Sequence, residues 1–293
     1  MIVGGSTTNN TNIAKPNCPA SCGNVIVPYP FGIGTDCSLD DTFNLTCNTS
    51  NHESPKLFIG DGNLRIYNIS DSELRIITFV SSQCYNQNGY VDGYTSYISI
   101  GSDMPLTFST KNKFTVVGCD DFALISGRDY VYFAGGCYGL CREEVDVIDG
   151  ECSGIGCCQA SMPKGLKYYN VTLNTLNKHS NVLSFNKCGY GFLVEEGKFK
   201  FNTSYLSTDS SNFINMIRST MPVVVDWVIK SNKSCDAVVN VCKGNSSCYD
   251  VEGGGYRCKC KDGYEGNPYL DEGCQETNID LRSKSLNRCD IHA

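Results

Sequence analysis

The chain has 293 residues, of which 19% are charged, and its 31 acidic and 24 basic side chains give a formal net charge of −7. This length allows two or three domains with hydrophobic cores of their own. Without a basic excess the chain would release few counterions from a phosphate backbone, so the composition excludes nucleic acid as a bulk electrostatic partner.

Cysteine is frequent, with nineteen residues spread along the whole chain. Reducing compartments rarely maintain such a set, so the cysteines indicate an oxidising, extracellular setting. Eight sequons for N-glycosylation also indicate an extracellular setting, because sequons and cysteines in such numbers together are a joint signal of secretion. They begin at Asn9, Asn44, Asn48, Asn68, Asn170, Asn202, Asn232 and Asn245. We therefore predict a glycoprotein that is exposed outside the cell.

Segments that would direct the chain to a membrane are not evident. Residues 1–5 are too short for a signal-peptide core, and the most apolar run, 222–229, is short and interrupted by Asp226. We expect no membrane contact by this segment. A leader, and any membrane anchor, are expected to lie outside this sequence.

The segment 18–37 reads CPASCGNVIVPYPFGIGTDC and comes after a polar stretch, 1–17, that we expect to be a flexible lead-in. Its prolines fix φ and extend the residues before them, and its later glycines permit a turn. Two interpretations of the rings of Tyr29 and Phe31 are open. They pack as the spine of a small core, or they form an aromatic face that stacks on a sugar ring.

Short strands are expected as far as residue 104, each rich in β-branched or aromatic residues and separated by Gly, Asn, Asp or Ser. They lie at 25–27, 57–59, 64–69, 74–80 and 94–100. The GDGN sequence at 60–63 predicts a hairpin turn. Alternation of apolar and polar residues then places Arg65 and Arg75 on a polar face.

The region 105–230 predicts further strands at 114–117, 130–133, 168–173, 182–185, 192–194 and 223–228. The adjacent Cys157 and Cys158 point in opposite directions on an extended chain, so we expect them to bond different partners. One helix is expected, at 210–220, with Ser or Asn as its cap. The fold class is therefore mainly β and disulfide-rich.

Six cysteines within 231–275 have the spacing C-x6-C-x5-C-x9-C-x-C-x13-C. Too little apolar sequence separates them for a core, so they form a disulfide scaffold, for which spacing alone leaves fifteen pairings open. With Tyr256 two residues before the fourth cysteine and Gly263-Tyr264 after the fifth, the region resembles an epidermal-growth-factor-like module. The resemblance implies the pairs Cys235–Cys248, Cys242–Cys258 and Cys260–Cys274.

Outside this module, the twelve cysteines between Cys18 and Cys188 are an even set that can form six bridges. A tail, 276–293, follows the growth-factor-like module. Its single Cys289 is either free or the first cysteine of a second, incomplete module.

The sequence contains no recognisable catalytic or metal-binding motif. The three histidines, His52, His179 and His292, occupy no recognisable nucleophile setting, and the adjacent acids at 40–41, 120–121 and 143–144 are typical of solvated turns. The Cys-x3-Cys spacings at 18–22 and 137–141 suit zinc, but an oxidising setting favours disulfides. The residues 230–234 lack the acidic cluster that calcium-binding modules need. We expect no enzyme activity, no cofactor and no metal site.

Several ordered motifs together resemble the extracellular region of plant wall-associated receptor kinases. They are CGNVIVPYPFGIG (22–34), FNLTC (43–47), LFIGDGN (57–63), VGCDDFALISG (117–127), GCYGLC (136–141), CSGIGCCQASMP (152–163), CGYGFLVEEGKFKF (188–201), PVVVDWVI (222–229) and GYEGNPYL (263–270). The resemblance covers nearly everything between Cys18 and Cys274.

This resemblance implies two consecutive cysteine-rich β domains, a galacturonan-binding domain at 18–104 and a second domain at 105–230, followed by the growth-factor-like module at 231–275. It implies pectin or oligogalacturonides of the cell wall as ligand, with protein co-receptors as further partners. Complete members continue into a membrane span and an intracellular kinase, and this sequence stops before both. Its tail, 276–293, is atypical for the family, because it does not continue into the usual second growth-factor-like module. We therefore predict a polysaccharide-binding, non-catalytic ectodomain that faces the cell wall.

A polygalacturonate is a row of carboxylates, which guanidinium groups match better than ammonium groups do. The candidate cations are Lys56, Arg65, Arg75, Lys111 and Lys113, with Tyr29 and Phe31 as candidates for contact with the sugar faces. The alternative is that Arg65 and Arg75 are solvated strand positions. At the level of function, the alternatives are an extracellular protein-interaction or adhesive module without sugar binding, and a secreted wall hydrolase or inhibitor.

Overall fold

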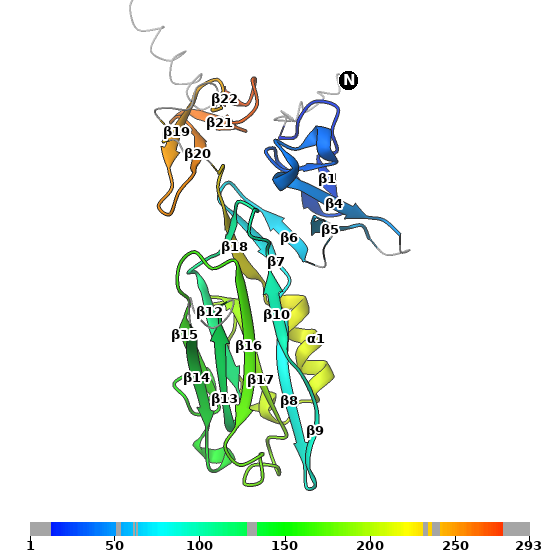
Figure 1. Ribbon diagram of the computed structural model, residues 1–293, viewed down its shortest axis with the longest axis vertical. Helices are drawn as coiled ribbons and strands as arrows, with labels where there is room; N and C mark the ends of the chain where they lie inside the picture. Colours follow the sequence, from blue (N-terminus) through cyan, green and yellow to red (C-terminus); the bar gives the residue numbers. More distant parts are fainter. Residues whose placement is uncertain are drawn as a thin grey trace, which may run out of the picture. The chain divides into compact units, whose positions relative to one another are not determined.

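The computed structural model describes residues 13–50, 54–60, 62, 64–127, 134–230, 234–235 and 241–277. The chain divides into two compact units, one made of 1–63 with 228–293 and the other of 64–227 (Figure 1). Strands dominate both units and nine disulfides join the cysteines that the structure describes, so the predicted mainly-β, disulfide-rich class is confirmed.

The first unit consists of short strands and single 3-10 turns. Its elements are β1 (Ser21–Cys22), β2 (Val25–Ile26), β3 (Gly32–Ile33), η1 (Thr35–Cys37), η2 (Asp41–Phe43), β4 (Asn44–Asn48), β5 (Lys56–Ile59), β19 (Ser246–Asp250), β20 (Tyr256–Cys260), β21 (Tyr264–Gly266) and β22 (Cys274–Glu276). Strand β3 pairs parallel with β4, and β4 pairs antiparallel with β5. The disulfides Cys18–Cys37 and Cys22–Cys47 hold this small sheet and its turns together.

The growth-factor-like module of this unit contains two hairpins, β19 with β20 and β21 with β22. Its disulfides are Cys235–Cys248, Cys242–Cys258 and Cys260–Cys274, the three pairs that the resemblance implies. A hydrogen bond inside the module adds to these disulfides: the Cys258 amide donates to Tyr269 Oη at 2.9 Å.

Asn267 joins this module to the beginning of the chain. Its Nδ2 donates to the carbonyl oxygens of Tyr29, at 2.6 Å, and Ile13, at 2.8 Å, and the residue is only 5% exposed. The Tyr29 amide donates to the same Ile13 carbonyl, and Ala14 is buried. The lead-in that we expect to be flexible over 1–17 therefore begins to pack at residue 13.

The second unit contains three layers of secondary structure. Its elements are β6 (Arg65–Ile69), β7 (Glu73–Ile76), β8 (Val80–Asn86), β9 (Gly89–Tyr94), β10 (Ser96–Ser99), β11 (Leu106–Phe108), β12 (Asn112–Val117), β13 (Asp120–Ser126), β14 (Ala134–Leu140), η4 (Glu144–Asp146), β15 (Cys157–Ser161), β16 (Tyr168–Thr175), β17 (Cys188–Glu195), η5 (Thr203–Leu206), α1 (Ser210–Thr220) and β18 (Val223–Trp227). Strands β11, β18, β7 and β6 are neighbours in that order and pair antiparallel.

Two further sheets pack face to face, one with the order β15-β12-β17-β8-β9 and the other with the order β10-β16-β13-β14. They approach closely at Gly191 of β17, where a Cβ atom would lie 2.9 Å from Val171 Cγ1 of β16. The other face of the five-stranded sheet packs on α1 (Figure 1), where the ring of Phe213 lies 4.3 Å from that of Tyr190 between centroids. The result is a sandwich with one helix on its outside.

Disulfides bind these layers. Cys84–Cys188 links β8 to β17, and Cys137–Cys158 links the two sheets, while Cys119–Cys141 and Cys152–Cys157 fix the loops at one end. Cys157 and Cys158 have different partners, which confirms the prediction made from their adjacency. Disulfides also account for both of the Cys-x3-Cys pairs that have zinc-like spacing.

Most of the expected elements form, and the differences have local causes. The helix at 210–220 is confirmed, but its cap is Asp209, whose Oδ1 accepts hydrogen bonds from the amides of Ser211 and Asn212. The expected strand 74–80 is interrupted because Thr78 turns inward and donates to the Leu193 carbonyl at 2.6 Å. The expected strand 182–185 is a series of turns, since the amide of Phe185 bonds back to Val182.

The expected strand at 130–133 lies outside the described residues, as do two positions of the expected turn at 60–63. The division into units also differs from the boundaries expected at 104/105 and 230/231. Strands β8 and β10 pair with β17 and β16, so the hydrogen bonds group residues 64–104 with the later part of the chain. Sequence patterns do not disclose such distant pairing.

Candidate functional site

The two aromatic rings of the first segment occupy different environments. Phe31 is 1% exposed and meets the Phe43 ring edge to face, with centroids 5.2 Å apart, so its ring is not available to a sugar. Tyr29 is half-buried, and this burial is the main reason why the pKa of its hydroxyl is raised. The negative charges of Asp40 and Asp271 raise it further. The packing interpretation therefore holds for Phe31, and the surroundings of Tyr29 disfavour an anionic ligand.

Arg75 lies on β7 and is held by an acid from a distant strand. Its Nε donates to Glu195 Oε2 at 2.9 Å, and its Nη2 donates to Glu195 Oε1 at 2.6 Å. This bidentate bond raises the pKa of Arg75 although burial acts in the opposite direction. Glu73 adds a second acidic contact at 3.7 Å. A polyuronate would have to displace Glu195 before it could bind this guanidinium.

The two lysines Lys111 and Lys113 are also paired with glutamates. Lys111 Nζ contacts Glu73 Oε1, yet 61% of the Lys111 side chain stays exposed. Lys113 Nζ lies 3.1 Å from Glu196 Oε1 and donates to Ser161 Oγ at the same distance. Glu73 thus contacts both Lys111 and Arg75, while Lys113 and Glu196 form a separate ion pair. The three glutamates were not among the expected site residues, because only the folded chain brings them to these cations.

Arg65 differs from the other candidates. The pairing of Ile66 with Ile76, and of Asn68 with Arg75, places Arg65 and Arg75 on the same face of the β6–β7 hairpin, as the alternation predicts. The Arg65 guanidinium lies over the Tyr67 ring, 5.0 Å from its centroid. Its Nε is buried without a hydrogen-bond partner among the described residues. Lys56, the remaining candidate, is half-buried on β5.

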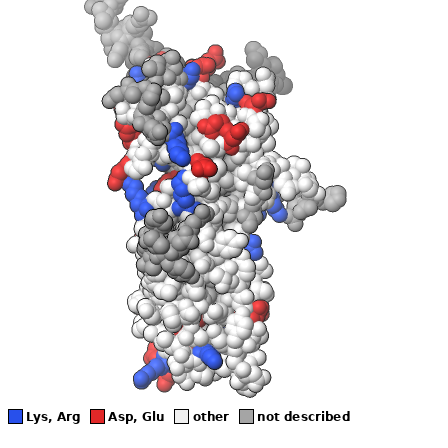
Figure 2. All heavy atoms as spheres, viewed as in Figure 1, with Lys and Arg blue, Asp and Glu red and all other residues white. Residues whose placement is uncertain are grey.

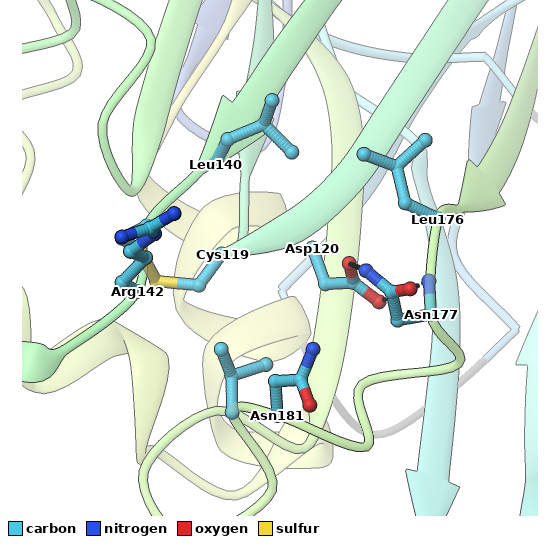
Figure 3. Close-up of a pocket in the computed structure, with 9 residues that line it drawn as sticks. Cys119, Asp120, Leu140, Arg142, Leu176, Asn177 and Asn181 are labelled. Atoms are coloured by element: carbon cyan, nitrogen blue, oxygen red, sulfur yellow. Dashed lines mark hydrogen bonds between the residues drawn. A yellow bond between two sulfur atoms is a disulfide. The ribbon is translucent and has the colours of Figure 1, made fainter.

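A cavity of about 580 Å³ opens at one end of the sandwich in the second unit. Figure 3 shows Arg142 and the Cys119–Cys141 disulfide on one side, and Asp120 hydrogen-bonded to Asn177 on the other. Its lining residues are Cys119, Asp120, Leu140, Cys141, Arg142, Leu176, Asn177, Asn181 and Val182. No sequence pattern indicated this cavity, because its walls come from the ends of β13 and β14 and from the 176–182 segment, which are separated in the chain.

Asp120 faces this cavity but is fully occupied as an acceptor. Its carboxylate accepts hydrogen bonds from Thr175 Oγ1 at 2.6 Å and from the amides of Asn177 and His179, both at 2.8 Å. Burial alone raises the pKa of Asp120, yet these bonds outweigh burial and hold it below its usual range. Asp120 is therefore an ionised anchor for the 175–179 turn.

The neighbouring Asp121 is fully buried and pairs with the fully buried His179, whose Nε2 lies 2.9 Å from Asp121 Oδ1. His179 Nδ1 lies 3.0 Å from the Asn186 carbonyl, so Nδ1 carries a proton, and one further proton is shared between Nε2 and Asp121. A Cβ atom at Gly189 would lie 1.9 Å from Asp121 Oδ1, so only glycine leaves room for this pair. The two adjacent acids thus serve the structure.

Among the described residues, three sequon asparagines are exposed, Asn48, Asn68 and Asn245, and three are half-buried, Asn44, Asn170 and Asn202. Asn9 and Asn232 lie outside the described residues, as does Cys289. Within the described ranges, no group of three or more acidic, histidine or cysteine side chains could hold a metal ion. No described helix has the length and apolar character required to cross a membrane.

Comparison with known proteins connects these features. Residues 18–80 match the family described as wall-associated receptor kinase galacturonan-binding. Over 286 residues, 95% of this chain, the sequence is 40% identical to Wall-associated receptor kinase 2 of Arabidopsis thaliana. Over nearly its whole length, this chain is similar to a part of the wall-associated receptor kinases, and it includes a match to their galacturonan-binding domain.

Other relatives in this family include Wall-associated receptor kinase 5 of Arabidopsis thaliana, 36% identical over 90% of this chain, and Wall-associated receptor kinase 3, 38% identical over 89%. The chain spans 37%, 35% and 36% of the lengths of these three wall-associated receptor kinases. No solved structure matches the chain.

The galacturonan-binding match, 18–80, contains β1 to β7. Five of the expected site residues lie within it: Tyr29, Phe31, Lys56, Arg65 and Arg75. Lys111, Lys113 and the cavity lie outside it. Within the galacturonan-binding match, Arg75 is bound to Glu195, whereas the described structure shows no acidic partner for Arg65.

Proposed function

We propose that this chain is the extracellular, wall-facing part of a wall-associated receptor kinase, and that it binds pectin or its oligogalacturonide fragments without transforming them. The observation that carries the proposal is the match of residues 18–80 to the galacturonan-binding domain of this family. In a complete family member we expect a membrane anchor to hold this part at the cell surface.

The charges of the second unit suggest how an acidic protein could bind an acidic polymer. Arg65 offers its guanidinium to a carboxylate at the start of β6, within the matched region. Lys111 is 61% exposed in spite of its contact with Glu73, so a ligand carboxylate could replace that glutamate at low cost. Arg75 is a weaker candidate, because its bidentate bond to Glu195 would have to break first.

The first prediction concerns Arg65. Arg65→Gln removes the charge but keeps a side chain that can pack on Tyr67, and we expect it to weaken oligogalacturonide binding about two- to fivefold, the effect of losing one exposed ion pair. Joint replacement of Lys56, Arg65 and Arg75 by alanine is expected to weaken binding about tenfold or more. Isothermal calorimetry with unesterified oligogalacturonides measures both effects.

Arg142→Gln is the matched control, because Arg142 is an exposed arginine outside the galacturonan-binding match. It should leave the affinity unchanged. Equal weakening by Arg142→Gln would move the site to the cavity, and unchanged binding by Arg65→Gln and the triple variant would refute the assignment of these cations. Added salt should weaken binding in the unmodified chain, because the Debye length falls from about 10 Å at 0.1 M to about 3 Å at 1 M.

The growth-factor-like module supports a second proposal, that the chain also contacts protein co-receptors. Its exposed hairpin β19–β20 carries Tyr249, which is 41% exposed. A pull-down with the chain in the presence and absence of oligogalacturonide separates this role from sugar binding. Incubation with polygalacturonate should produce no new reducing ends, since we propose that the chain is not an enzyme.

A further inference from the structure

The four-stranded sheet of the second unit has one face that no described element covers. This outer face is formed by Tyr97, Phe122, Leu124, Tyr138, Tyr168, Asn170 and Thr172. Tyr97 is 67% exposed, Tyr138 is 55% exposed and Leu124 is 42% exposed. The rings of Phe122 and Tyr138 stack with their centroids 5.7 Å apart. So much exposed apolar surface on one face indicates a binding partner.

The charge of this sheet restricts the choice of partner. Its four strands contain no Lys or Arg, and their only charged residues are the buried Asp120 and Asp121. Figure 2 shows few charged side chains on the visible surface over β13, β14 and β16. A polyuronate has no cation to bind on such a surface, whereas a neutral sugar can lie on it.

Asn170 lies within the outer face and begins a sequon, Asn170-Val171-Thr172. On β16, Tyr169 and Val171 are buried toward the sandwich, so the side chains of Tyr168, Asn170 and Thr172 point outward. In the sheet, Asn170 is directly opposite Tyr97 on β10 and Ser126 on β13. Side chains opposite each other on one face lie about 5 Å apart at Cβ.

We propose that Asn170 carries an N-linked glycan, and that the first N-acetylglucosamine of this glycan lies on Tyr97 and covers part of the outer face. The donor is a polyprenyl diphosphate oligosaccharide. A bond forms between Asn170 Nδ2 and C1 of the donor sugar, the bond from C1 to the diphosphate breaks, and Nδ2 loses one proton as the diphosphate leaves.

Geometry and chemistry both favour this partner. A pyranose ring has an apolar face of C–H groups that can pack on the exposed Tyr97 ring, while its hydroxyl groups keep their contact with water. The glycan is tethered on the outer face beside Tyr97, so it can cover part of that face without the entropy cost of a separate association. A glycan at Asn170 therefore accounts for both the sequon and the uncovered apolar face. The proposal does not depend on pectin binding.

The first experiment asks whether Asn170 is modified. The chain is produced through the secretory pathway of cultured plant cells, and glycopeptides are identified by mass spectrometry after glycosidase treatment in ¹⁸O-water, which labels each asparagine that carried a glycan. We expect a label at Asn170 in most molecules. Unmodified Asn170 in chains that are labelled at Asn245 would overturn the proposal.

The second experiment asks whether the glycan covers the outer face. Thr172→Ala and Asn170→Gln each remove this sequon, and Ser247→Ala removes the sequon of Asn245 on the growth-factor-like module as a matched control. We expect the first two variants to bind an apolar dye such as ANS several-fold more strongly than the unmodified chain does. Ser247→Ala should not change dye binding. Adding Tyr97→Ser to Thr172→Ala should abolish most of the increase.

Enzymatic trimming of the folded chain avoids any dependence on refolding. An endoglycosidase that leaves the first N-acetylglucosamine should keep dye binding low, and complete removal of the glycan should raise it. Equal dye binding before and after complete removal would show that the glycan leaves the face open. Dye binding that stays low because the deglycosylated chain dimerises in sedimentation would assign the face to a second copy. Either result would overturn the proposal.

Discussion

Replacing Cys84 and Cys188 together by alanine is expected to lower the free energy of unfolding of the second unit by about 4–5 kcal/mol. This disulfide joins β8 to β17 and closes a loop with a sequence separation of 104, the longest of the nine disulfides that the structure describes. A long closed loop greatly restricts the unfolded chain, so its removal favours unfolding. Guanidinium denaturation without reductant measures the change.

The matched control is the pair Cys152–Cys157, which closes a loop with a sequence separation of only 5. The same chain-entropy argument gives about 2 kcal/mol for this loop. Equal losses for the two double variants would contradict a role of loop length and point to local packing instead. Full reduction with dithiothreitol removes all the restraints at once, and we expect it to unfold the chain.

Asp121→Ala is expected to lower the free energy of unfolding of the same unit by about 3 kcal/mol or more, because it leaves a buried histidine without its partner. Asp121 and His179 are both fully buried, and Tyr85 stacks on the His179 ring with centroids 4.8 Å apart. The matched control is Asp209→Ala, which removes the cap of α1 and should cost about 1 kcal/mol. A smaller loss for Asp121→Ala than for this control would contradict the role of the pair.

The same pair gives the stability a definite dependence on pH. Burial raises the pKa of Asp121, and for His179 the hydrogen bond and charge of Asp121 outweigh burial and raise the pKa as well. The folded pair therefore keeps its shared proton at a pH where the unfolded chain has lost it. Between pH 3.8 and pH 6.5, the ordinary pKa values of the two groups, the unfolded chain also holds one proton because its Asp121 is ionised and its His179 is protonated, so the pair makes no contribution to the pH dependence of stability there.

Above about pH 6.5 unfolding releases the shared proton, so we expect the free energy of unfolding to fall by up to about 1.4 kcal/mol per pH unit until the folded pair also deprotonates. Asp121→Asn keeps the shape and removes this proton, so its stability should be nearly constant over the same pH range. Denaturant unfolding of both proteins between pH 6 and 9 checks this. A rise in stability with pH in the unmodified chain would have the wrong sign.

Local chemistry made part of this structure predictable. The apolar spacing of 210–220 gave the helix, and the adjacency of Cys157 and Cys158 gave their different partners, because neighbouring residues decide both features. The alternation in the β6–β7 hairpin likewise placed Arg65 and Arg75 on one face. Each of these features depends on residues that are close in the sequence.

Features that join distant residues were not predictable from the same patterns. Glu195 binds Arg75 from 120 residues away, and His179 meets Asp121 from 58 residues away. The cap Asp209 was missed for a different reason, since Ser210, Ser211 and Asn212 are equally good cap residues and only the backbone geometry selects among them. The candidate binding residues were the hardest feature to predict, because a cation is available to a ligand only if the fold brings no acidic side chain to it.

The bond between Asn267 and the carbonyls of Tyr29 and Ile13 has a mechanical consequence. Residues 64–227 leave the first unit and return to it, so this segment is an insertion between two parts that are joined directly. If the chain is held at residues 18–50 and pulled at residue 277, the shortest path for the force runs through Asn267. The inserted unit then lies in parallel with that contact, and it would be stretched only after the contact had broken.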